Sequence, residues 1–71
     1  MDKKYGEYRN LKAELMRSGV TQNQVAEHLG MTVKSLNRRI NGFTPFTLPE
    51  MVEIRKVFTP DATLDYLSIA D

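Results

Sequence analysis

Apolar residues recur at helical spacing along most of the chain, with polar residues between them. This period is typical of amphipathic helices, and it predicts helices over residues 7–17, 22–29, 33–41, 48–58 and about 61–69. No stretch shows the apolar-polar alternation of a half-buried strand. The pattern therefore predicts an all-α fold, a small bundle of about five helices.

Cap residues support the predicted helix boundaries. Thr21 with Gln24, and Thr47 with Glu50, have the spacing of a capping box, in which each side chain bonds the backbone of the other residue. Thr32 is the expected N-cap of the third helix. Glycines follow the first and third helices, where a left-handed residue commonly ends a helix.

The inward positions of these helices are apolar and predict the core. They are Tyr8, Leu11, Leu15, Val20, Val25, Ala26, Leu29, Leu36, Ile40, Leu48, Met51, Ile54, Phe58, Leu64 and Leu67. In the loop after the third helix, we expect Phe46 in the core and Phe43 partly exposed. With 71 residues, the chain is expected to form one domain over residues 1–71, with residues 1–6 frayed.

The second and third helices are separated only by Leu29-Gly30-Met31, which is too short for a flexible linker. Ala26 has a small side chain where two helices must approach closely. Gly30 can take a positive φ without a steric clash, and Leu36 can fill the angle between the helices. This arrangement over residues 22–41 is what a helix-turn-helix requires.

The same stretch resembles the helix-turn-helix of the Cro-type (XRE-like) family of phage repressors. The matching residues are Thr21-Gln22, Val25-Ala26, Leu29-Gly30, Ser35-Leu36 and Asn41-Gly42. The resemblance extends over residues 11–67, because 46–48 and 64–67 also look like phage members of that family. It implies a lambda repressor-like DNA-binding domain in a sequence-specific transcription regulator, Cro-like in its small size, from a phage or mobile-element genetic switch.

The outward face of the third helix is suited to reading DNA. Lysine and arginine match guanine in the major groove, asparagine matches adenine, and valine methyls can touch the thymine methyl. The resemblance assigns base reading to the first turn and to one residue a turn later, and it assigns a backbone contact to the start of the second helix. The candidate DNA-binding residues are Gln22, Asn23, Thr32, Val33, Lys34, Ser35, Asn37, Arg38 and Thr44, of which Gln22, Asn23 and Thr44 would contact the sugar-phosphate backbone.

Each of these candidates also has an interpretation without DNA. Lys34 and Arg38 can form a solvated helix face, Val33 can border the core, and Ser35 can satisfy a backbone carbonyl. Arg39 departs from the family pattern, which has a large apolar or aromatic residue there. We expect its stem to cover apolar surface while its guanidinium lies in water or pairs with a glutamate of the fourth helix, Glu50 or Glu53.

The net charge of +1 hides an asymmetry along the chain. Residues 1–42 carry eight basic against four acidic residues, whereas residues 43–71 carry two against five. A polyanion should therefore approach the first part and leave the acidic tail for another partner. Apolar residues available for a protein contact are Phe43, Phe58, Tyr66, Leu67 and Ile69. They leave open a monomer, a homodimer, or a second function as a modulator that binds a larger phage repressor.

Several function classes find no support in the sequence. The chain has no cysteine, and its single histidine, His28, is expected on the surface of the second helix, near a DNA phosphate at most. We therefore expect no metal, no cofactor and no enzymatic activity. No apolar run approaches the roughly 20 residues of a membrane span, and the charged start is no signal peptide. These features fit a protein of the bacterial cytoplasm, associated with the nucleoid.

Overall fold

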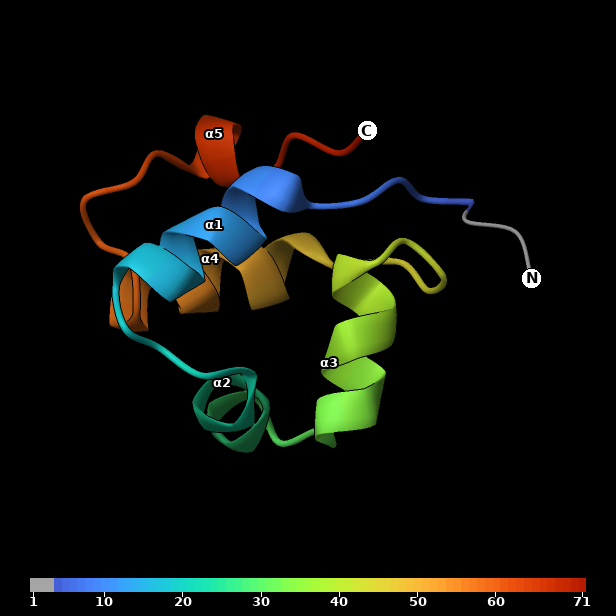
Figure 1. Ribbon diagram of the computed structural model, residues 1–71, viewed down its shortest axis with the longest axis horizontal. Helices are drawn as coiled ribbons and strands as arrows, with labels where there is room; N and C mark the ends of the chain where they lie inside the picture. Colours follow the sequence, from blue (N-terminus) through green and yellow to red (C-terminus); the bar gives the residue numbers. More distant parts are fainter. Residues whose placement is uncertain (1–3) are drawn as a thin grey trace.

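The computed structural model describes residues 4–71. Within them lie five helices: α1 (Arg9–Arg17), α2 (Gln22–Leu29), α3 (Val33–Ile40), α4 (Leu48–Val57) and α5 (Leu64–Leu67). In Figure 1, α1 and α4 cross the middle of the molecule with α5 above them, while α2 and α3 form the opposite side. No strand occurs in this part of the chain, and the predicted all-α fold is confirmed.

One apolar core joins all five helices. It consists of Leu11, Leu15, Val25, Ala26, Leu36, Ile40, Met51, Ile54 and Leu67, with Tyr8, Phe46 and Phe58 among the partly buried residues packed against it. Helix α2 packs against α3 and α4, and α5 packs against both α1 and α4. Burial of these side chains supplies most of the driving force for folding.

The expected burial of Leu48 is wrong, because its side chain is 63% exposed. At 100° per residue, Leu48 shares a face of α4 with Val52, and that face is turned by about 110° from the one formed by Met51 and Ile54. Val52 is correspondingly exposed. Phe58 is only partly buried, since it lies at the C-cap of α4 rather than within the helix.

The predicted caps are present. The Thr21–Gln24 and Thr47–Glu50 pairs both form complete capping boxes, and Thr32 Oγ1 accepts a hydrogen bond from the backbone N–H of Ser35 at 3.1 Å. Two helices are shorter than predicted: α1 begins at Arg9, and α5 has only four residues. Tyr8 is the N-cap of α1, with the non-helical backbone angles φ −90° and ψ 71°, and its N–H donates to the Ile40 carbonyl at 2.9 Å.

The chain start expected to fray is held in place where the structure describes it; residues 1–3 of that segment lie outside the described residues. The Tyr5 N–H donates to the Gly42 carbonyl at 3.1 Å. Glu7 and Asp71 exchange two backbone hydrogen bonds, at 2.9 and 3.0 Å. The beginning of the chain is therefore tied both to the end of α3 and to Asp71.

Replacing Gly42 by alanine is expected to destabilise the fold more than the same change at Gly19. Both glycines have positive φ, +86° and +69°, which costs an alanine roughly 1–2 kcal/mol. An added Cβ at Gly42 would also lie 2.4 Å from the Gly6 carbonyl oxygen, whereas a Cβ at Gly19 meets nothing within 4 Å. Urea unfolding should show a loss of about 1–2 kcal/mol for Gly19→Ala and a clearly larger loss for Gly42→Ala. Equal losses would contradict the contact between residues 5–7 and α3.

None of the helices between residues 4 and 71 has the length and apolar character needed to cross a membrane.

Candidate nucleic-acid interface

The turn between α2 and α3 has the geometry expected from its sequence. Gly30 has φ +72°, and the Met31 N–H bonds the Ala26 carbonyl at 3.0 Å. Ala26 of α2 and Leu36 of α3 are both buried in the core that the two helices share. In Figure 1, α2 is seen end-on while α3 is seen from the side and runs in the plane of the picture, so the two helices cross steeply as in a helix-turn-helix.

The first turn of α3 faces solvent. Lys34 is exposed, Val33 is 38% exposed, and Thr32 is exposed while its hydroxyl caps the helix. Asn23, at the start of α2, is also exposed. These residues form a surface that combines a cation, a methyl-bearing side chain and polar groups, which suits the edges of base pairs in the major groove.

A row of amide side chains connects the two helices of the motif. Asn37 Nδ2 donates to Gln22 Oε1 at 3.1 Å, and Asn41 Nδ2 donates to Asn37 Oδ1 at 2.8 Å. The side-chain oxygen of Gln22 therefore points toward α3, and the side-chain NH₂ group of Gln22 is turned away from Asn37. Gln22 and Asn37 were candidate DNA-binding residues from the sequence and Asn41 was not; the i, i+4 spacing of the two asparagines was the available signal.

Arg38 lies at the border of this surface and contacts the loop that follows α3. Its guanidinium lies over the Phe43 ring, with 5.7 Å from the guanidinium carbon to the ring centroid. The Arg38 carbonyl accepts hydrogen bonds from the N–H groups of Phe43 and Thr44, at 2.9 and 3.4 Å. The loop therefore folds back on Arg38 and restricts the directions its side chain can take. Phe43 is half-buried and Phe46 packs on the core, as the sequence predicted.

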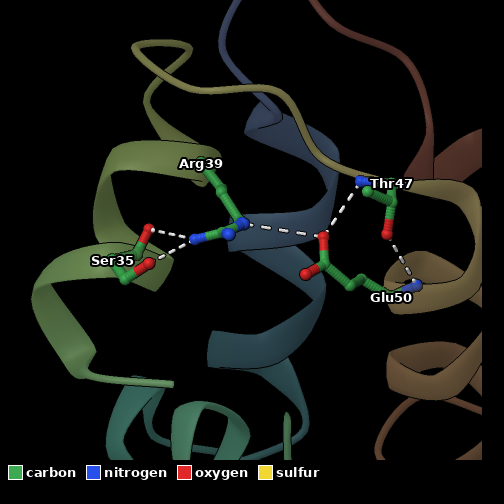
Figure 2. A network of polar contacts seen from close by, with 4 residues as sticks. All are labelled: Ser35, Arg39, Thr47 and Glu50. Carbon is green, nitrogen blue, oxygen red and sulfur yellow. Dashed lines mark hydrogen bonds and ion pairs between the residues drawn. The ribbon is translucent and has the colours of Figure 1, made fainter. Parts of the chain in front are cut away.

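Two candidate DNA contacts do not fit their expected role. The Thr44 hydroxyl oxygen is buried and has no hydrogen-bond partner within residues 4–71, so it is not presented to a phosphate. The Ser35 hydroxyl accepts a hydrogen bond from Arg39 Nη1 on the side of α3 that faces α4, as Figure 2 shows. Neither position follows from the residue type, since Ser35 bonds a side chain one turn further along α3 and the Thr44 hydroxyl is buried without a hydrogen bond.

Arg39 and His28 both pair with glutamates of α4. Arg39 Nε lies 3.5 Å from Glu50 Oε1, so of the two predicted partners it pairs with Glu50. Glu53 instead contacts His28, with 2.8 Å between Nε2 and Oε1, and the His28 ring meets the Phe58 ring edge-on at 5.5 Å. His28 is therefore exposed on the surface of α2, as expected, with its ring directed toward α4. No group of three potential metal ligands occurs within the described residues.

The predicted protein-contact residues are mostly engaged in the fold. Leu67 is fully buried in the core and cannot form an external surface, which corrects that assignment. Phe58 and Tyr66 are half-buried against the core. Ile69 is exposed, and Leu48 and Val52 add an exposed apolar pair on α4 that the sequence pattern did not predict.

Comparison with known proteins agrees with this geometry. A family model described as helix-turn-helix matches residues 11–59, which is more than half of the chain and includes most of α1 and all of α2, α3 and α4. No curated protein and no solved structure matches the chain. Together with the steep α2–α3 crossing, the match shows that the chain belongs to the helix-turn-helix family of DNA-binding transcription regulators.

Proposed function

We propose that this protein binds a specific operator by placing α3 in the major groove, as a Cro-like regulator in the genetic switch of a phage or related mobile element. The observation that carries the proposal is the exposed first turn of α3, next to the amide row that begins at Gln22. The excess of basic residues over 1–42 would attract the DNA, and the acidic excess over 43–71 would keep the rest of the molecule away from it.

In this proposal the exposed residues divide into two roles. Val33, Lys34 and Arg38 read base edges, and Asn37 can contact adenine once its amide turns from Gln22 and Asn41 toward the base. Gln22 and Asn23, at the N-terminus of α2, contact phosphates, where the helix dipole also favours an anion. Such phosphate contacts set the register of α3 on the duplex and leave sequence discrimination to the base contacts.

A symmetric dimer would place two copies of α3 about 34 Å apart, one turn of B-DNA, and would bind a palindromic operator. With Leu67 in the core, exposed apolar residues that could form such a contact include Ile69 and the Leu48–Val52 pair of α4. This pair equally favours the second candidate function, a modulator that binds a larger phage repressor. It is an exposed apolar surface on a helix outside the motif, in the acidic part of the chain.

A salt titration of operator binding separates the two functions. The operator is obtained by selecting duplexes from a random pool with the wild-type protein. A DNA reader should give log K against log salt with a slope of about −0.9 per phosphate contact. Lys34→Gln should weaken binding, whereas Lys56→Gln, an equally exposed lysine on α4, should leave it unchanged. If no duplex is enriched and the protein co-elutes with a larger repressor, the modulator is the correct function.

A further inference from the structure

Helix α3 is held in place on two sides. Its apolar face, with Leu36 and Ile40, packs into the core beside α1 and α2. On its other flank, Arg39 extends across to the N-terminus of α4, as Figure 2 shows. The apolar anchor fixes how closely α3 packs but restrains its rotation and tilt less, because hydrophobic contact is not directional.

The Arg39 guanidinium is held at both ends. Nη1 donates to the Ser35 carbonyl oxygen at 3.2 Å and to the Ser35 hydroxyl, both one turn back on α3. Nε faces Glu50 Oε1 at 3.5 Å, where the contact is an ion pair without a hydrogen bond. The charge of Arg39 is thus directed by α3 itself toward α4.

The partner carboxylate is also fixed before it meets Arg39. Glu50 Oε1 accepts the Thr47 N–H at 2.9 Å, which closes the capping box of α4. A carboxylate in the first turn is further favoured by the helix dipole. Both partners are therefore held by their own helices, so their attraction acts on the helices and not only on two flexible side chains.

We propose that Arg39 is a positioning residue of the DNA interface, and that the Arg39–Glu50 pair sets the orientation of α3 relative to α4. The inference rests on the proposed DNA-reading role of α3. Direct contact between Arg39 and DNA does not fit the geometry, because Nε is buried and the side chain is only 24% exposed. Stability alone does not explain the pair either, since an apolar side chain would cover this flank without desolvating a charge.

The test measures the affinity of Arg39→Met, Glu50→Gln and the double variant for the selected operator and for a scrambled duplex. The ratio of the two affinities is the preference for the operator. Methionine keeps an apolar stem, and glutamine at the third position of α4 can still complete the capping box. Each single variant should stay folded and lose about 5- to 20-fold in preference for the operator over the scrambled duplex. The double variant should lose no more than either single one, and the salt slope should stay at the wild-type value.

Arg17→Met and Glu14→Gln provide the matched control. These two residues form an ion pair on α1, at 2.9 Å, and contact neither α3 nor α4 through it. Both controls should keep the wild-type preference.

Three outcomes would overturn the inference. Glu50→Gln with wild-type preference would show that the pair does not orient α3. If Arg39→Met reduces the salt slope by the amount that corresponds to about one phosphate contact, Arg39 contacts a phosphate directly. Equal losses on operator and scrambled duplex, in step with a loss of stability, would indicate a merely structural role. If the wild-type protein itself shows no operator preference, the proposed function fails, and this result is distinct from the other three.

Discussion

Replacing Leu36 by alanine is expected to lower the free energy of unfolding by about 2–5 kcal/mol. Leu36 of α3 is fully buried in the common core, where close packing leaves the neighbouring side chains little freedom to fill the cavity. A single domain of this size rarely has more than about 3–5 kcal/mol of stability. Urea and thermal unfolding followed by circular dichroism should therefore show a largely unfolded Leu36→Ala protein at 37 °C.

Leu48→Ala is the matched control for this experiment. It removes the same atoms from a side chain that is 63% exposed, so the change in stability should stay within about 0.5 kcal/mol. The two variants together also show whether Leu48 of α4 is a core residue or an exposed one. A loss at Leu48 comparable to that at Leu36 would place Leu48 in a core, as the sequence pattern alone suggested, and would contradict the observed face of the helix.

Arg38→Ala is expected to weaken binding to the selected operator by about 1–3 kcal/mol and to relax the preference at one base pair. Arg38 has the side chain best suited to guanine, and its packing over the Phe43 ring restricts the guanidinium before DNA arrives. Restricting a long side chain in advance lowers the conformational entropy that binding would otherwise cost. Titrations on the operator and on single-base variants of it would measure both effects.

Arg17→Ala serves as the control for charge, since this arginine lies on α1 and its side chain is 67% exposed. It should leave operator affinity and base preference unchanged. If Arg38→Ala weakens operator and scrambled DNA equally and reduces the salt slope by about one, Arg38 contacts a phosphate instead of a base. Unchanged operator affinity would remove Arg38 from the interface altogether.

Features that depend on neighbours in the chain could be predicted from the sequence. The capping boxes of α2 and α4, the positive φ of Gly30 and the tight α2–α3 turn all rest on residues no more than a few positions apart. The local backbone then imposes the same geometry whatever the rest of the molecule does. For that reason the helix-turn-helix and the exposed position of Lys34 could be predicted from the sequence.

Features that depend on distant segments were settled only by the tertiary structure. A side chain with two possible orientations follows whichever partner the fold brings near: Arg39 turns to Glu50, and His28 to Glu53. Leu67, one residue of a short amphipathic segment, became core because α5 packs between α1 and α4. Periodicity shows that a residue is apolar or polar, but only the packing of helices determines which of its faces meets protein and which meets water.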